Sequence, residues 1–234
     1  MMKFQFVRAL QGVALMCLLS SAAHASIVIT GTRVIFPSDA KEVSVRVSNK
    51  GEAPVLIQSW IDKGDVNATP DKIRVPFILT PPINRVDAGS GQTLRIRGTA
   101  NNLPKDRETV FWLNVLEIPA VPKGTKEDSQ NYLQVAFRSR IKFFYRPTGL
   151  KGNAGDAATQ LQWLAAGNTL RVKNASPYYV SLSTVKVNGK TLDGKMIAPF
   201  SEDTYAAHAA AGSKIQAEYI TDYGALKKTE SIAK

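Results

Sequence analysis

The stretch LPKDRETVFWLNVLEIPA, residues 103–120, contains the strongest structural signal in the chain. Its middle part, Val110 to Ile118, is strongly apolar, which is typical of an inner strand. The pairs Leu103-Pro104 and Ile118-Pro119 bracket this part, and proline cannot continue a β-ladder. The stretch therefore predicts an inner strand of a β-sandwich.

Short strand candidates surround this stretch, separated by turn residues at the spacing of about 8–12 positions that is typical of β-sandwiches. On its N-terminal side, Val43 to Val47 and Thr93 to Arg97 alternate between apolar and polar residues. On its C-terminal side, Tyr132 to Tyr145 is the longest strand candidate in the chain. The sequence Arg146-Pro147-Thr148-Gly149 ends that strand and marks a domain boundary.

The second half of the chain has the same character. Leu170 to Val172 and Tyr178 to Val187 alternate, and Asn188-Gly189 predicts a tight hairpin because both residues tolerate a positive φ. No segment shows sustained helical periodicity. The sequence therefore predicts an all-β fold of two tandem immunoglobulin-like β-sandwich domains, residues 26–147 and 148–234.

Residues 1–25 have the pattern of a cleaved signal peptide. Lys3 and Arg8 form a positive start, Gly12 to Leu19 is a short apolar run, and Ala23-His24-Ala25 offers the small residues that a signal peptidase accepts. The apolar run is too short to span a membrane, so no membrane insertion is expected. Cleavage after residue 25 predicts an exported protein.

Composition narrows the function further. Removal of residues 1–25 leaves 28 Lys and Arg against 19 Asp and Glu, no cysteine, and His208 as the one histidine. A metal site or a cysteine nucleophile is therefore not expected, and neither is a cofactor. Export and the dispersed basic residues argue against nucleic acid as a partner and favour an acidic protein partner.

Residues 103–120 match, at every required position, the signature of periplasmic pilus chaperones of the chaperone–usher, PapD-like family, which this chain resembles. The resemblance spans both domains. Further matching segments are Thr32-Arg33, Gln58-Ser59-Trp60, Thr80-Pro81-Pro82, residues 140–147 and residues 222–225. It implies two domains at an angle that form a cleft, a periplasmic location, pilus subunits and an outer-membrane usher as partners, and no catalytic residue.

The resemblance also implies a donor strand in the first domain. Pilus chaperones complete an unfinished immunoglobulin-like subunit by lending it an extended edge with apolar side chains at every second position. Leu133, Val135 and Phe137 form such a row. The pattern alone favours the plainer interpretation that this row belongs to the chaperone's own core, and the resemblance reverses that preference.

Two cations are the implied anchor of the subunit's C-terminal carboxylate, Arg33 and Lys142. Two cations at one cleft repel each other unless an anion lies between them, so a carboxylate guest is physically reasonable. Either residue alone would more often be a solvated surface cation. The same resemblance implies ion pairs between the domains by Glu108, Arg146 and Asp222, and it places Pro54 at the contact with the usher.

The loop Val121 to Asn131 resembles the short-loop subfamily, because it lacks the cysteine pair of the long-loop group although it is slightly longer than the shortest members. Whether the free protein dimerises through its exposed edge stays open at this point.

The sequence also bears on other classes of function. Gly89-Ser90-Gly91-Gln92-Thr93 is similar to a phosphate-binding loop, but no Gly-Lys-Ser/Thr follows, and His208 has no evident catalytic partner. An enzyme is therefore not expected. The alternative is an Ig-like structural fibre subunit or adhesin, although pilins typically carry a disulfide that this chain lacks. Carbohydrate binding by a sandwich face is a third class that the sequence leaves open.

Overall fold

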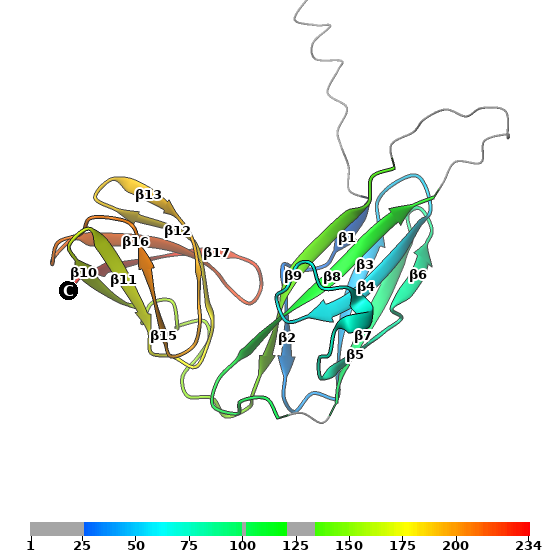
Figure 1. The fold of residues 1–234 in the computed structure, drawn as a ribbon, viewed down its shortest axis with the longest axis horizontal. Helices are drawn as coiled ribbons and strands as arrows, with labels where there is room; N and C mark the ends of the chain where they lie inside the picture. Colours follow the sequence, from blue (N-terminus) through cyan, green and yellow to red (C-terminus); the bar gives the residue numbers. More distant parts are fainter. Residues whose placement is uncertain (1–25, 100–101, 121–133) are drawn as a thin grey trace, which may run out of the picture.

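The computed structural model describes residues 26–99, 102–120 and 134–234, so the signal peptide prediction, the loop Val121–Asn131 and Leu133 lie outside the described residues. The described chain forms two β-sandwiches, one from each half of the sequence, joined at one end (Figure 1). Its single helical element is the 3-10 turn η1, Pro70–Lys72. No helix in these ranges is long and apolar enough to cross a membrane.

The first domain packs a four-stranded sheet on a five-stranded one. The four-stranded sheet has the order β1 (Ile27–Ile29), β3 (Glu42–Asn49), β7 (Gly91–Gly98), β5 (Phe77–Thr80). The five-stranded sheet has the order β2 (Arg33–Pro37), β9 (Phe137–Arg146), β8 (Thr109–Pro119), β4 (Val55–Asp62), β6 (Ile83–Val86). The chain enters through β1 in one sheet and crosses with β2 into the other.

The predicted inner strand is confirmed as β8, which lies in the middle of the five-stranded sheet. Its core-facing residues Phe111, Leu113 and Val115 are at most 2% exposed. The ring of Phe77 lies 5.0 Å from that of Phe111 and 4.7 Å from that of Phe143 in edge-to-face contacts. Burial of each such side chain stabilises the folded domain by roughly 1.5–3 kcal/mol, so this domain holds together without a disulfide.

The strand β9 is shorter than the sequence predicted. It begins at Phe137 rather than Tyr132, and with 10 residues it is shorter than β8, which has 11. Residues 134–136 precede it outside any strand. The alternating pattern therefore predicted too early a start for this strand, because a strand also needs a neighbour to pair with along its whole length.

One edge of β9 is half open. The strand pairs with β8 from Phe137 to Tyr145, but on its other side it pairs with β2 only from Lys142 to Arg146, in parallel. Within the described residues, no strand occupies the second edge of β9 between Phe137 and Ile141. The first half of β9 therefore presents unpaired backbone groups, and the second half is covered.

The second domain has a three-stranded and a five-stranded sheet. The first has the order β10 (Gln162–Ala166), β11 (Thr169–Asn174), β15 (Ser201–Tyr205). The second has the order β13 (Lys190–Asp193), β12 (Val180–Val187), β16 (Lys214–Ile220), β17 (Leu226–Ile232), and β14 (Met196–Ile197) also pairs with β12. Trp163, Leu170 and Ile215 are buried in its core.

The predicted hairpin in the second domain is confirmed. Asn188 and Gly189 have φ values of 49° and 79° and join β12 to β13. Two positive φ values are what a two-residue hairpin turn requires.

Candidate functional site

Arg33 and Lys142 lie side by side at the junction of the two domains, because Arg33 of β2 is the register partner of Lys142 of β9. The guanidinium of Arg33 donates from Nη1 to the carbonyl oxygen of Ile220 at 3.1 Å. The ammonium of Lys142 lies 3.0 Å from the hydroxyl of Ser181. Both cations therefore reach from the first domain to neutral oxygen atoms of the second.

The electrostatics of this pair are unfavourable in the free protein. Burial, and then the charge of Arg33, lower the pKa of Lys142 from 10.5 to about 8. Burial likewise lowers the pKa of Arg33, and the charges of Asp222 and Glu108 only partly oppose this effect. A bound anion would relieve both the repulsion and the loss of hydration.

Neither cation has an acidic partner among the described residues. In the described ranges no carboxylate lies within ion-pair distance of Arg33 or Lys142, whereas two other cations of β9 are paired. Arg140 binds Asp62, and Arg146 binds Glu108. The unpaired charge at the domain junction is therefore concentrated at Arg33 and Lys142.

The predicted donor row lies beside the open edge. Val135 and Phe137 are each 46% exposed, a large fraction for apolar side chains. Phe137 lies on the same face of β9 as Ile141, which packs against the core of the first domain. The row therefore continues the core face past the end of the core, where its side chains are uncovered. Leu133 lies outside the described residues.

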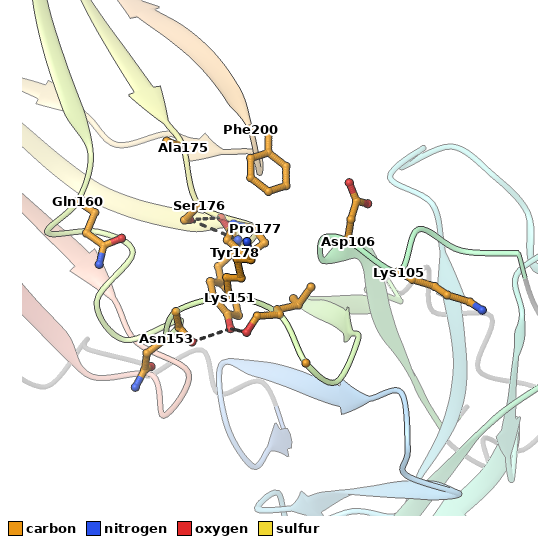
Figure 2. Close-up of a pocket in the computed structure, with 13 residues that line it drawn as sticks. Lys105, Asp106, Lys151, Asn153, Gln160, Ala175, Ser176, Pro177, Tyr178 and Phe200 are labelled. Carbon is orange, nitrogen blue, oxygen red and sulfur yellow. Dashed lines mark hydrogen bonds between the residues drawn. The ribbon is translucent and has the colours of Figure 1, made fainter.

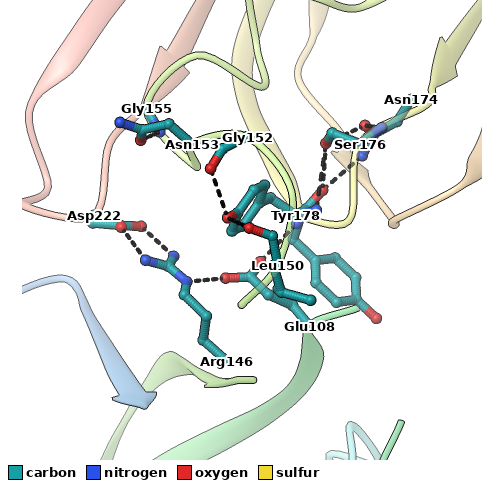
Figure 3. A network of polar contacts seen from close by, with 11 residues as sticks. Glu108, Arg146, Leu150, Gly152, Asn153, Gly155, Asn174, Ser176, Tyr178 and Asp222 are labelled. Carbon is teal, nitrogen blue, oxygen red and sulfur yellow. Dashed lines mark hydrogen bonds and ion pairs between the residues drawn. The ribbon is translucent and has the colours of Figure 1, made fainter. Parts of the chain in front are cut away.

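Glu108, Arg146 and Asp222 form one network across the domain junction (Figure 3). Arg146 donates from Nε to Glu108 at 2.6 Å and from Nη1 and Nη2 to the two oxygens of Asp222 at 2.8 and 3.1 Å. Burial raises the pKa of Glu108, and Arg146 only partly opposes this. Burial alone would lower the pKa of Arg146, but hydrogen bonds and charges of Asp222 and Glu108 offset it, and the net pKa is raised.

Backbone groups add to this network, and sequence reasoning did not find them. Glu108 accepts a hydrogen bond from the backbone N–H of Tyr179 at 2.7 Å and donates its own N–H to the carbonyl of Pro177 at 2.9 Å. The ring of Phe144 lies 5.6 Å from that of Tyr179. Backbone partners carry no side-chain signature, so only the fold brings them to Glu108.

A cavity of about 530 Å³ lies elsewhere at the junction, between the loops of the two domains (Figure 2). It is lined by Lys105 and Asp106 of the first domain and by Tyr178 and Phe200 of the second, together with residues 149–153 of the connecting segment. Arg107 lies over the ring of Phe200 at 4.9 Å. None of the predicted site residues lines this cavity.

Pro54 lies directly before β4, in the first domain. Its neighbour Val55 pairs with Pro119 of β8, whereas Lys142, farther along the sheet, pairs with Trp112. The structure therefore places Pro54 at the other end of the sheet from the Arg33–Lys142 pair.

Comparison with known proteins identifies relatives of the whole chain. Residues 26–151 match the family model of the pili and flagellar-assembly chaperone PapD N-terminal domain, and residues 156–231 match the model of the pili assembly chaperone PapD C-terminal domain. The chain is 50% identical over 218 residues to the probable fimbrial chaperone YadV of Escherichia coli K12, with 88% of this chain and 89% of that protein covered.

Two further relatives agree with this match. The chaperone protein MrkB of Klebsiella pneumoniae is 49% identical over 213 residues, which cover 88% of this chain and 91% of MrkB. The structure also superimposes on one chain of the complex of the Salmonella enterica SafA pilin with the SafB chaperone. The TM-score is 0.77, the identity is 29%, and the match covers 91% of this chain and 98% of the matched chain. The similarity therefore extends over both sandwiches.

Proposed function

Because the chain belongs to the family of PapD-like pilus-assembly chaperones, which are not enzymes, we propose that it chaperones pilus subunits by lending them the open edge of β9. The guest is an immunoglobulin-like subunit that lacks its last strand. Its final segment pairs with β9, and its C-terminal carboxylate binds Arg33 and Lys142. Family membership also separates this function from the alternative of a fibre subunit or adhesin.

The coincidence of the open edge with the cation pair carries this proposal. The edge of β9 is open up to Ile141, and at Lys142 it becomes covered by β2, which begins at Arg33. A guest strand on the open part would therefore have to end where the two cations lie. A strand that ends there runs in the same direction as β2, parallel to β9.

The uncovered row provides the apolar part of the interaction. Val135 and Phe137 are available to a guest, and burial of the exposed 46% of each would contribute about half of the roughly 1.5–3 kcal/mol that full burial gives. Each charge-assisted contact to the carboxylate adds about 1.5–3 kcal/mol. These terms add to the backbone hydrogen bonds of the open edge, and together they oppose an association cost of roughly 4–15 kcal/mol.

Delivery of the guest to an outer-membrane usher and a periplasmic location complete the proposed function. The signal-peptide pattern of residues 1–25 and the named fimbrial chaperones among the relatives support them. Pro54 lies at the end of the sheet distant from the cation pair and is proposed to contact the usher, as the resemblance to the family implies.

Periplasmic co-expression with a candidate pilin subunit tests this function. We expect the subunit to co-purify with the tagged chain in a one-to-one complex and to be degraded or aggregated in its absence. A panel of pilin subunits that all fold and assemble without the chain, and none of which co-purifies with it, would contradict the proposal.

A further inference from the structure

A buried ion pair lies on the outer face of the five-stranded sheet, away from the core of the first domain. Asp62 of β4 binds Arg140 of β9 at 2.6 Å, and their side chains are 2% and 17% exposed. Arg140 crosses the intervening strand over the ring of Trp112, at 4.3 Å. Asn114 donates to the second carboxylate oxygen of Asp62 at 2.7 Å.

This pair is not explained by stability alone, because burying two charges costs about as much as their attraction returns. Its position along β9 is more informative. Arg140 lies two residues before Lys142 on the same face of the strand, a rise of about 7 Å. A guest strand held on the open edge would pass Arg140 immediately before it reaches the cation pair.

The position of Arg140 bears on the register in which a guest strand would pair with β9. A slip of one residue turns every apolar side chain to the wrong face and is strongly disfavoured. A slip of two residues keeps every side chain on its face, so the alternating row opposes it less than a slip of one, only through the mismatch of individual side chains. In such a slip the guest's carboxylate would meet Arg140 in place of Lys142.

We propose that Asp62 sets the register of the guest by occupying Arg140, so that the carboxylate finds its free cations only at Arg33 and Lys142. This inference rests on the proposed function. Arg138, one step farther along the face, is exposed and donates to the carbonyl of Val66 at 2.9 Å. An exposed cation attracts a carboxylate weakly, so Arg138 needs no such partner.

The test compares two guests. One is a pilin subunit that the native chain captures in periplasmic co-expression, and the other is the same subunit without its last two residues. In the native register the shortened guest ends beside Arg140. The measured quantity is the ratio of the two dissociation constants, obtained on purified chaperone.

The native chain is expected to bind the full-length guest at least tenfold more tightly than the shortened one. A tenfold difference in dissociation constant corresponds to the loss of one charge-assisted hydrogen bond. Asp62→Asn keeps the size of the side chain and a hydrogen-bond acceptor but frees Arg140. We expect it to bind the shortened guest better than the native chain does and to lower the ratio about tenfold. Asp62→Asn combined with Arg140→Gln is expected to restore the native ratio.

Two results would overturn the register role. One is a native ratio in Asp62→Asn, and the other is a lowered ratio that persists in the double variant, because the loss would then be structural. If Asp62→Asn is poorly soluble, Asp62→Ser makes the same comparison. If the native chain does not distinguish the two guests, both the carboxylate anchor and this inference are contradicted. If it distinguishes them but the variants do not behave as expected, only this inference fails.

Discussion

Arg33 and Lys142 are register partners in the parallel pairing of β2 with β9, at the point where the edge of β9 changes from open to covered. Two basic side chains from separate strands thus share one end of the open edge. No acidic side chain of the described residues neutralises them at ion-pair distance. The proposed position of the guest's terminus and its proposed recognition by charge both rest on this relationship.

Arg33→Ala and Lys142→Ala are each expected to weaken subunit binding about 10- to 100-fold, because each removes one charge-assisted contact. The thermal midpoint of the free protein is expected to stay the same or to rise slightly, since each change relieves repulsion between two cations. Isothermal titration with a purified subunit measures the affinity. Arg97→Ala, an exposed cation of the other sheet, is the matched control. Native affinity in both variants would exclude the anchor.

The pKa of about 8 for Lys142 predicts that subunit affinity falls between pH 7 and pH 9, by at most about tenfold per pH unit above 8. The free protein loses this proton as the pH rises, whereas a carboxylate guest binds the protonated form. Lys142→Arg does not titrate in this range and is expected to give a flatter profile. Identical slopes for the two proteins would contradict this assignment.

Stability of the free protein should change in the opposite direction over the same pH range. The folded pKa of Lys142 lies below the ordinary value of 10.5, so the unfolded state binds more protons between pH 8 and 10.5. Denaturant unfolding is expected to show a stabilising contribution that grows from pH 7.5 to 9.5 and is missing from Lys142→Gln. A contribution of the opposite sign would show that the pKa is not lowered.

Phe137→Ser is expected to reduce subunit affinity at least tenfold and to lower the free energy of unfolding by only about 1 kcal/mol, because nearly half of the side chain is exposed in the free protein. Leu113→Ala, in the buried strand next to it, is expected to cost about 2–5 kcal/mol of stability. Denaturant unfolding measures the stability of each variant, and binding assays measure its affinity for the subunit. A loss of several kcal/mol in Phe137→Ser would assign the row to the chaperone's own core.

Arg146→Ala is expected to widen the distribution of interdomain angles while both sandwich cores stay folded, because the two cores contain none of the three network residues. Small-angle scattering measures the change, and circular dichroism checks the cores. Arg146→Lys keeps the charge but cannot bind both carboxylates with a planar fork, and it should fall between the native chain and Arg146→Ala. An unchanged scattering profile in Arg146→Ala would show that other contacts fix the angle.

Gly224→Ala probes the contact between the β16–β17 turn and the first domain. Gly224 has a φ of 81°, and an added Cβ would lie 2.7 Å from the hydroxyl oxygen of Thr32. The strained φ alone costs about 1–2 kcal/mol. We expect a lower thermal midpoint and weaker subunit binding, because Asp222 and the carbonyl of Ile220 belong to the same turn region. Binding and stability equal to those of the native chain would show that the turn is not fixed against Thr32.

The sequence predicted the all-β fold and the inner strand because those depend on local apolar pattern, which residues 110–118 show clearly. It placed Glu108, Arg146 and Asp222 in one cluster only through resemblance to a family, since 114 positions separate Glu108 from Asp222. It did not find the start of β9 at Phe137, the roles of Tyr179 and Ser181, or the pairing of Asp62 with Arg140. These depend on which strands become neighbours, and a single sequence does not encode that in local pattern.

The open edge of β9 ends where β2 begins, and this arrangement limits when a guest polypeptide could bind. A strand that occupies the edge has no room for further residues beyond Lys142, since Arg33 and the rest of β2 already fill the continuing track. An unfinished or still-translocating polypeptide has no free terminus to place there. Binding through this edge would therefore require a guest chain whose synthesis and export are complete.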